Sequence, residues 1–270
     1  MLIAQISDTH IREAGELCYD KVDTAAFLRR AVAKLNALKP RPDLVIATGD
    51  LVDQATPGEY ERLRNILAPL QIPVYLAIGN HDHRDHLRNV FADHAYLPKG
   101  KFLQYTLEHL AVRLIVLDTN IPGQGAGELC AERLAWLDAR LAEQPARPSI
   151  IVMHHPPFTT GILPMDGLGL SGVAEFGAVA AKYRNIEAIV CGHLHRPIQS
   201  RFAGTIAMTC PSTAHQIHFG IGDAAVWGFN FEPPSFLVHW WNGRSLATHT
   251  VQIDAFDGPY SFKGGKPIAV

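Results

Sequence analysis

Short runs of apolar residues recur along the chain and predict buried strands, because a strand covered on both faces needs no polar side. We expect such strands at residues 2–6, 44–47, 74–78, 114–117, 150–153 and 188–191. Between most of them, apolar residues recur every three or four positions, which predicts helices at about 27–38, 60–67, 134–141 and 173–183. This alternation favours a largely parallel sheet with helices on its faces.

The last third of the chain has a different pattern. Helical spacing fades after about Arg184, and alternating apolar runs at 235–241 and 245–253 flank Asn242-Gly243, a pair typical of a tight hairpin turn. We expect a second, more antiparallel β region, a mobile glycine-rich loop over 219–228 and an irregular tail over 254–270. The expected domains are a catalytic core over 1–210 and a β-rich part over 211–270, which completes the second sheet and offers a cap or dimer contact.

Composition narrows the classes of protein to consider. The chain has 270 residues, of which 47% are hydrophobic, enough for one large domain. Its net charge of −2 and lack of basic runs argue against a nucleic-acid polymer as partner. Apolar runs are too short to span a membrane, and the N-terminus has no positive segment, so we expect a strand there and a cytoplasmic protein. The four cysteines are widely spaced and are expected to be free thiols.

Residues that can bind metals follow five of the six expected strands. In open α/β sheets, ligands bind beyond the carboxyl ends of the strands, so these five segments are predicted to converge. The segments are Asp8-Thr9-His10, Gly49-Asp50, Gly79-Asn80-His81-Asp82, His154-His155 and Gly192-His193-Leu194-His195.

Spacing within the segments suits metal binding. In an extended chain, residues two apart point the same way, so Asp8 and His10 can face one ion. Imidazole and carboxylate suit zinc, iron or manganese. Seven candidate ligands exceed what one ion needs; if Asp50 bridges, two ions receive four protein bonds each and keep positions for water and substrate. Each motif alone has an ordinary explanation, such as a turn, but their combination predicts a dinuclear site.

The ordered set D-x-H, G-D, G-N-H-D, H and G-H-x-H, over residues 8 to 195, resembles the calcineurin-like metallophosphoesterases. Within them it is most similar to the bacterial class III cyclic-nucleotide phosphodiesterases and their glycerophosphodiesterase relatives. Serine/threonine protein phosphatases carry G-D-x-x-D-R-G and G-N-H-E instead, whereas here Gln54 follows Asp53 and Asp82 follows His81. A protein phosphatase is therefore not expected.

The resemblance implies a four-layer α-β-β-α sandwich with two mixed sheets and the metals at the strand C-terminal ends. It implies that His81 stands unliganded beside the substrate phosphate. We expect Asn80 and His81 to be the catalytic residues and to contact substrate. The region around His215 is similar to the same branch, and we expect His215 to contact substrate. The implied ligands are Asp8, His10, Asp50 and His195 for one metal, and Asp50, Asn80, His154 and His193 for the other.

The function expected from these features is metal-dependent hydrolysis of small phosphodiesters, such as cyclic nucleotides or glycerophosphodiesters. A hydroxide shared by two divalent ions (iron, manganese or zinc) attacks phosphorus, and His81 either stabilises charge or protonates the leaving group. The alternative enzyme is a phosphomonoesterase or nucleotidase on the same site. A metal-binding protein without hydrolytic activity is the alternative from another class, and a homo-oligomer is expected.

The sequence supports less specific expectations for Asp82, His155 and the aromatic residues near the end of the chain. Asp82 or His155 could orient a ligand imidazole. The aromatic residues near the end of the chain are expected to pack in the core of the second sheet, with a wall for a nucleobase or a dimer contact as alternatives. They are Trp227, Phe229, Phe231, Trp240 and Trp241.

Overall fold

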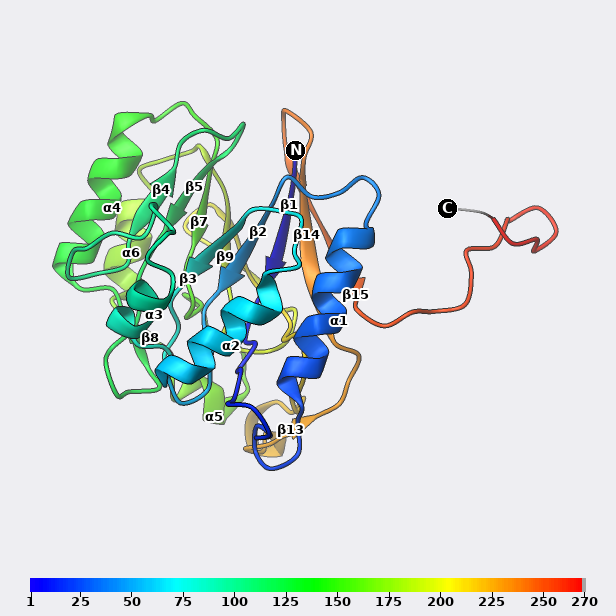
Figure 1. Ribbon diagram of the computed structural model, residues 1–270. Coiled ribbons are helices and arrows are strands. Elements are labelled where there is room, and N and C mark those ends of the chain that lie inside the picture. The colour runs from blue at the N-terminus through cyan, green and yellow to red at the C-terminus, as the bar shows by residue number, and fades with distance from the viewer. Residues whose placement is uncertain (269–270) are drawn as a thin grey trace.

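Two mixed β-sheets lie face to face at the centre of the molecule, in a computed structural model that describes residues 1–268 (Figure 1). The first sheet has the order β15-β14-β1-β2-β3, and the second has the order β10-β11-β9-β7-β5-β4. The first sheet consists of β1 (Leu2–Ile6), β2 (Leu44–Thr48), β3 (Val74–Ala77), β14 (Ser235–Trp241) and β15 (Leu246–Gln252). The second consists of β4 (Tyr105–Leu107), β5 (Arg113–Val116), β7 (Ser149–Val152), β9 (Ile186–Cys191), β10 (Gln199–Phe202) and β11 (Thr205–Thr209).

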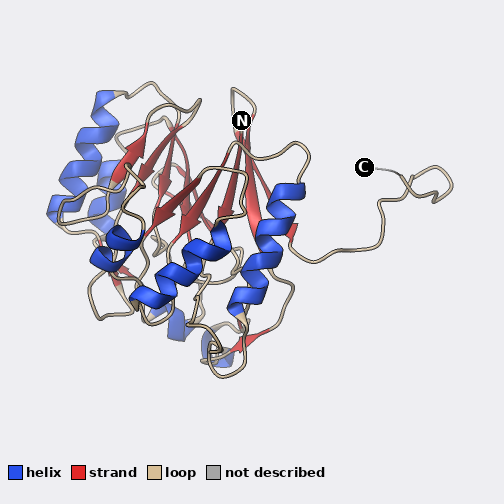
Figure 2. Ribbon diagram, in the orientation of Figure 1, coloured by secondary structure: helices blue, strands red, loops and turns tan. Residues whose placement is uncertain are grey.

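Helices cover the outer face of each sheet (Figure 2). On the first sheet lie α1 (Thr24–Ala37) and α2 (Pro57–Leu67), and on the second lie α4 (Ala131–Glu143) and α6 (Val173–Ala180). The shorter α3 (Arg84–Val90) packs beside α2, and α5 (Leu163–Asp166) is a single turn. The four-layer α-β-β-α sandwich expected from the sequence is therefore confirmed.

Local sequence explains where the helices begin. Asp23 caps α1 by accepting a hydrogen bond from the backbone N–H of Ala26. Thr56 and Glu59 form a reciprocal capping box at α2. Pro57 lies in the first turn, where a backbone N–H would have no partner within the helix, so its missing N–H costs nothing. These caps orient both helices over the first sheet.

The continuous apolar runs are buried because the central strands have two covered faces. Ile3, Leu44 and Ile46 point between the sheets, whereas Ala4 and Val45 point toward α1 and α2. Three apolar clusters result, one between the sheets and one beneath each helical layer. This packing fixes the carboxyl ends of the strands relative to one another.

The C-terminal hairpin forms where the Asn242-Gly243 turn predicted it, but it does not complete a second sheet. Strand β14 pairs antiparallel with β1, so the hairpin extends the sheet of the N-terminal strand. Phe236 packs beneath the helices and Leu237 between the sheets, which gives β14 two covered faces. The more antiparallel pairing expected in the last third is present, whereas the sheet that the hairpin joins has no local sequence signal because strand pairing is non-local. The domain boundary at residue 210 stays a prediction.

Smaller elements border the strand ends. Two short sheets pair β6 (Gly127–Glu128) with β8 (Leu170–Ser171), and β12 (Gln216–Ile217) with β13 (Phe229–Asn230). A single 3-10 turn, η1 (Gly222–Ala224), interrupts the loop over 219–228. Residues 254–268 extend away from the body as an irregular tail with one isolated bridge, and 269–270 lie outside the described residues (Figure 1). Within residues 1–268, every helix is too short or too polar to cross a membrane.

Candidate dinuclear metal site

The loops after β1, β2, β3, β7 and β9 meet at one end of the two sheets. They bring together all seven ligands expected from the sequence. Of these residues, only Asn80 is partly exposed, and the others are buried. The convergence follows from the fold, because each loop leaves the carboxyl end of a central strand.

The donor atoms form two groups that share Asp50. In one group, Nε2 of His10 lies 3.6 Å from Oδ2 of Asp50 and 3.2 Å from Nε2 of His195, which lies 3.5 Å from Oδ1 of Asp8. In the other, Nε2 of His154 lies 3.3 Å from the same Oδ2 of Asp50 and 3.1 Å from Oδ1 of Asn80. Nδ1 of His193 lies 3.1 Å from that amide oxygen. One carboxylate oxygen thus faces both groups.

Each candidate imidazole is anchored through its other nitrogen. Nδ1 of His154 donates to the carbonyl of Thr48 at 2.8 Å, and Nδ1 of His195 donates to the carbonyl of His215 at 3.0 Å. Nε2 of His193 donates to the carbonyl of Leu168 at 3.1 Å. Because a carbonyl can only accept, the nitrogen that faces the group carries the lone pair whenever the ring is neutral. The rings are therefore held in the tautomer that a metal requires.

This donor set fits divalent cations. Nε2 of His154 and Nδ1 of His193 face the amide oxygen of Asn80 at 3.1 Å, and Nε2 of His10 faces Nε2 of His195 at 3.2 Å. Without a metal, contacts of this kind need a proton between the two atoms, in agreement with the raised pKa values of His154 and His10, and a divalent cation can take the place of that proton. Ligands bonded to one tetrahedral zinc-like ion at about 2.1 Å lie about 3.4 Å apart, close to the spacing found here.

Electrostatics also favour positive charge at this place. Burial and the charge of Asp50 raise the pKa of Asp8 to about 6, although His154 opposes them. Burial lowers the pKa of His154, but the carboxylates of Asp50 and Asp8 outweigh it and raise the value to about 9. Burial and the neighbouring His154 lower the pKa of His193 to about 3, which leaves that ring neutral. Two buried carboxylates therefore attract cations, and His193 is free to bind one.

The backbone at the candidate ligands is unusual. Asp8, His10, Asp50, His193 and His195 have φ between 40° and 70°, in the left-handed region. Asp and His adopt this region more readily than most residues, at some cost. Asp8 and His10 do lie in the same donor group, but the expected reason, an extended chain, was wrong. The chain has left the strand here, and left-handed turns bring the two side chains to the same group.

Glycine permits the closest approaches between these loops. A Cβ on Gly79 would collide with the backbone nitrogen and Oδ1 of Asp50. A Cβ on Gly192 would collide with Oγ of Ser7 and lie 3.0 Å from Oδ2 of Asp8. The tight packing expected at glycines before candidate ligands is confirmed at both positions.

His81 lies beside the two groups without belonging to either. Its backbone N–H donates to Oδ1 of Asp50 at 2.9 Å, and Nδ1 donates to the carbonyl of Asp53 at 2.8 Å. Nε2 is left facing the pocket, and the side chain is 32% exposed. This is the position expected for an unliganded histidine beside a substrate.

Asp53 is a residue that sequence reasoning missed. Its Oδ1 accepts a hydrogen bond of 3.3 Å from Nδ1 of His10, and its Oδ2 lies 3.2 Å from the Arg12 guanidinium. Burial raises the pKa of Asp53, but the hydrogen bond and charge of His10 outweigh it and hold the value well below its ordinary range. The signal that could have found it is a carboxylate three residues after Asp50.

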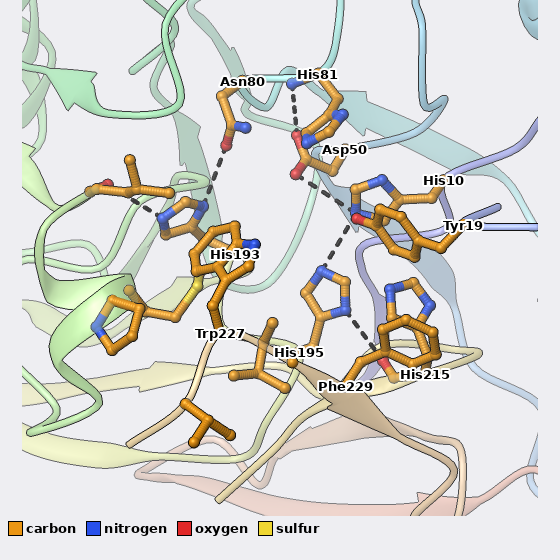
Figure 3. A pocket seen from close by; sticks show the side chains of 16 residues that line it. His10, Tyr19, Asp50, Asn80, His81, His193, His195, His215, Trp227 and Phe229 are labelled. Atoms are coloured by element: carbon orange, nitrogen blue, oxygen red, sulfur yellow. Dashed lines mark hydrogen bonds and ion pairs between the residues drawn. The ribbon is translucent and has the colours of Figure 1, made fainter. Parts of the chain in front are cut away.

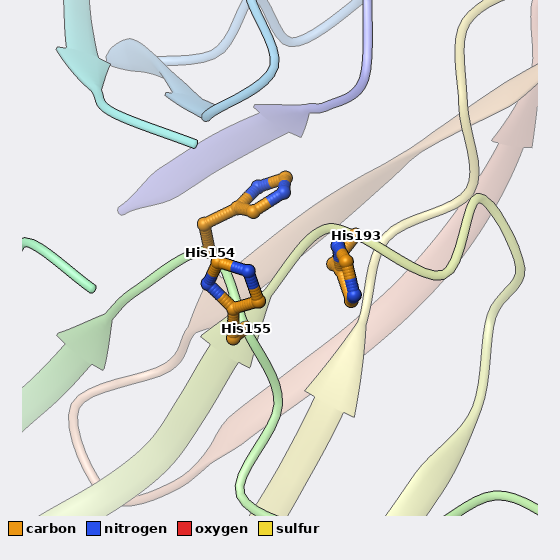
Figure 4. A group of neighbouring side chains, drawn as sticks. All are labelled: His154, His155 and His193. Atoms are coloured by element: carbon orange, nitrogen blue, oxygen red, sulfur yellow. The ribbon is translucent and has the colours of Figure 1, made fainter. Parts of the chain in front are cut away.

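Neither Asp82 nor His155 has a hydrogen bond to a candidate ligand imidazole. Asp82 accepts from the backbone N–H of Gly79 and Leu51 and from the Tyr60 hydroxyl, so it ties two loops to α2. His155 donates from Nε2 to the carbonyl of Gly125 and accepts from the Thr119 hydroxyl at Nδ1. Its ring packs against His193, with centroids 4.4 Å apart (Figure 4). Both nitrogens of His155 are thus engaged, which favours a packing role over metal binding.

A pocket of about 440 Å³ opens over the donor groups (Figure 3). His215 lines it, as do Tyr19, Trp227 and Phe229. Trp227 is 70% exposed, so the expectation that it packs in a sheet core was wrong, and Phe231 and Trp240 are half-exposed as well. Among these aromatic residues only Trp241 is buried in the core between the sheets. The alternative of an aromatic wall fits the observed positions of Trp227 and Phe229.

Comparisons with known proteins agree with this geometry. Residues 1–197 match the model of the calcineurin-like phosphoesterase family. The chain is 37% identical to a probable glycerophosphodiester phosphodiesterase GpdQ of Arcobacter nitrofigilis, covering 98% of each chain. It is 34% identical to a probable cyclic nucleotide phosphodiesterase of Rhodopseudomonas palustris, covering 96% of this chain and 94% of the relative.

The fold has solved counterparts. A dimetal phosphatase from Danio rerio superposes with a TM-score of 0.70 at 15% identity, covering 94% of this chain and 96% of the other. At that identity the likeness concerns the fold alone. Together with the family match over most of the chain, it leads to one conclusion: the chain belongs to the calcineurin-like phosphoesterase family.

Proposed function

We propose that the protein is a metal-dependent phosphodiesterase that hydrolyses small phosphodiesters. The observation that carries the proposal is the Asp50 carboxylate, whose Oδ2 faces His10 of one donor group and His154 of the other. This arrangement is what two neighbouring cations need in order to share one ligand. Relatives named as glycerophosphodiester and cyclic nucleotide phosphodiesterases support the diester as substrate.

Two divalent cations would be held by the seven residues, with Asp50 between them. Asp8, His10 and His195 complete one site, and Asn80, His154 and His193 complete the other. When bound, the cations supply a water nucleophile activated at neutral pH and positive charge for the phosphoryl oxygens. Iron, manganese and zinc all suit imidazole and carboxylate ligands.

The protein's own groups bind and orient the phosphate. Nε2 of His81 is free because Nδ1 is anchored to the carbonyl of Asp53. With Nδ1–H committed to that carbonyl, Nε2 carries a proton only in the imidazolium form, in which it can donate a hydrogen bond to a phosphoryl oxygen or pass a proton to the departing alcohol oxygen. Two divalent cations outweigh the charges of Asp8 and Asp50, so the loaded site attracts an anionic diester. His215 lines the pocket, which supports the proposal that it contacts the bound substrate.

The test combines metal reconstitution with a pair of substrates. The chelated protein, reloaded with manganese, zinc or iron, should hydrolyse bis(4-nitrophenyl) phosphate faster than 4-nitrophenyl phosphate. An Asn80→Ala variant should keep the circular dichroism spectrum of the fold and lose most of the rate. A monoester rate far above every diester rate would instead identify a phosphomonoesterase. Metal binding without any hydrolysis would identify a non-enzymatic protein and overturn the proposal.

Three further features stay predictions: the identity and number of the metal ions, a homo-oligomeric state and a cytoplasmic location. Metal content by elemental analysis and mass by light scattering address the first two. Fractionation of the source cells addresses the third.

A further inference from the structure

Two hollows, not one, border the candidate catalytic groups. The aromatic pocket, of about 440 Å³, is the one walled by Tyr19, Trp227 and Phe229. The polar groove, of about 750 Å³, runs from Asp53 past the start of α3 to residues 122–125. Asn80 and His81 line both hollows. In Figure 3 Asn80 and His81 lie at one side of the pocket, and Trp227 and Phe229 lie toward the other.

The aromatic pocket is built for a bulky apolar or flat group. Beyond the candidate metal ligands and two histidines, its walls are Tyr19 and the apolar side chains of Pro164, Met165, Leu168, Ile217, Val226, Trp227 and Phe229. The rings of Tyr19 and Phe229 lie 5.2 Å apart, and the exposed indole of Trp227 borders the pocket. Such surfaces hold rings by stacking and release ordered water when covered.

The polar groove has the opposite character, yet its charges are already satisfied. Arg84 pairs with Asp118 through two bonds of 2.7 and 2.8 Å. Arg88 pairs with Asp85 at 3.0 Å, and Lys101 with Glu132 at 2.8 Å. A second phosphate would have to compete with these carboxylates. The groove instead offers uncharged polar atoms that suit hydroxyls: the exposed side chain of Gln124, Oε1 of Gln54, whose Nε2 already donates to Asp53, and Nε2 of His83, whose Nδ1 already accepts from His86.

We propose that the polar groove is a second substrate subsite, which holds an uncharged, hydroxyl-bearing ester arm while a bulky apolar or aromatic arm occupies the aromatic pocket. The inference rests on the proposed phosphodiesterase function. The two ester oxygens of an acyclic diester diverge from phosphorus and carry separate arms, so a phosphate held at Asn80 and His81 can send one arm into each hollow. A 3′,5′-cyclic diester joins both ester oxygens in one ring, so it can fill only one. The site therefore favours acyclic over cyclic diesters.

Two aryl diesters that differ only in the second arm test this subsite. In the manganese-loaded enzyme, 4-nitrophenyl glycerol phosphate should exceed methyl 4-nitrophenyl phosphate in kcat/KM by about tenfold or more, since the glycerol hydroxyls find partners in the groove. Gln124→Trp, at an exposed groove position, should bring that ratio toward one, whereas Ala146→Trp, in an exposed loop outside both hollows, should leave it unchanged. Circular dichroism confirms that each variant is folded.

A cyclic nucleotide supplies the third substrate. Its kcat/KM relative to methyl 4-nitrophenyl phosphate should not respond to Gln124→Trp, because a cyclic diester does not reach the groove. Loss of all three activities in proportion, or a glycerol arm without advantage in the unaltered enzyme, would overturn the subsite. Failure of the phosphodiesterase function looks different, since no metal-loaded sample would then hydrolyse any diester.

Discussion

The loops at the strand ends and the segment 217–231 border the same pocket but are built in opposite ways. The loops are buried, hold five residues in the left-handed region and pack against glycine. The segment instead exposes large apolar side chains, with Phe219 at 59%, Val226 at 52% and Trp227 at 70%. The two regions therefore have different constraints. Packing fixes the positions of the candidate metal ligands in the loops, whereas side chains of the segment 217–231 that line the pocket can change without disturbing the fold.

The largest expected effect comes from Asp50→Asn. The amide has no charge and binds two cations poorly, so kcat/KM for bis(4-nitrophenyl) phosphate should fall by about 10³-fold or more. The same change in the other region, Asp223→Asn, alters an exposed residue outside the pocket lining and should leave kcat/KM unchanged. Similar losses in both variants would erase the contrast between the regions.

Asp53→Asn should weaken metal binding by about 10- to 100-fold, because the amide holds the Nδ1–H of His10 less firmly than the carboxylate does. Titration of the chelated protein with manganese, followed by calorimetry, measures the change. Asp53→Ala should lose more metal affinity than Asp53→Asn, because alanine offers no acceptor for the Nδ1–H of His10. Equal affinity in the three proteins would show that Asp53 does not support the metal ligand.

Gly79→Ala should lower the free energy of unfolding by about 1 to 3 kcal/mol, because its Cβ collides with Asp50. Gly228→Ala is the matched control in the segment 217–231, since its Cβ would meet only Cγ2 of Val226, at 3.9 Å. Urea unfolding of the two variants compares the regions directly. An unchanged free energy of unfolding in Gly79→Ala would mean that the loops can move apart to admit the extra carbon.

Acid should destabilise the fold through His239, a buried residue of β14 whose Nε2 donates to Oε1 of Gln5 at 3.0 Å. Burial lowers the pKa of His239 to about 4, below its ordinary value of 6.5. The unfolded chain then binds the proton more readily, so the stability contributed by neutral His239 is complete above pH 6.5 and is lost as the pH falls toward 4. The loss at pH 5.5 is about 1 kcal/mol. Urea unfolding of His239→Gln at pH 5.5 and 8 should show a pH dependence smaller by that amount; an identical dependence would exclude this group.

Trp227→Ala should produce the smallest effect on the fold, with a change of no more than about 0.5 kcal/mol in the free energy of unfolding. It should raise KM for aryl diesters several-fold and leave kcat nearly unchanged, because in the proposed binding mode the indole contacts the substrate arm rather than the phosphate. Steady-state kinetics and thermal unfolding together measure both. A marked loss of stability would place Trp227 in the core after all.

The sequence predicts those features of the fold and of the candidate site that a short stretch of residues encodes by itself. Apolar runs placed β1 and β9, and Asn242-Gly243 placed the hairpin turn. The candidate ligands were found because each stands directly after such a run. The pairing of β14 with β1 was missed, since partners more than 230 residues apart leave no local pattern.

Other features depended on the assembled molecule. Asp53 looks like any turn residue until His10 is seen to contact it. The exposure of Trp227 could not be predicted, because composition alone does not say which side of an aromatic residue is covered. The left-handed backbone at His193 and His195 follows from crowding between loops that only the fold brings together.

The pairing of β1 with β14 also affects the order of folding. Residues 2–5 leave the ribosome early, yet their neighbours at 237–240 are made more than 200 residues later. Until then the N-terminal strand offers an unpaired edge, which is a template for aggregation. Truncation before Ser235 should therefore yield insoluble chains, even though every candidate metal ligand would still be present.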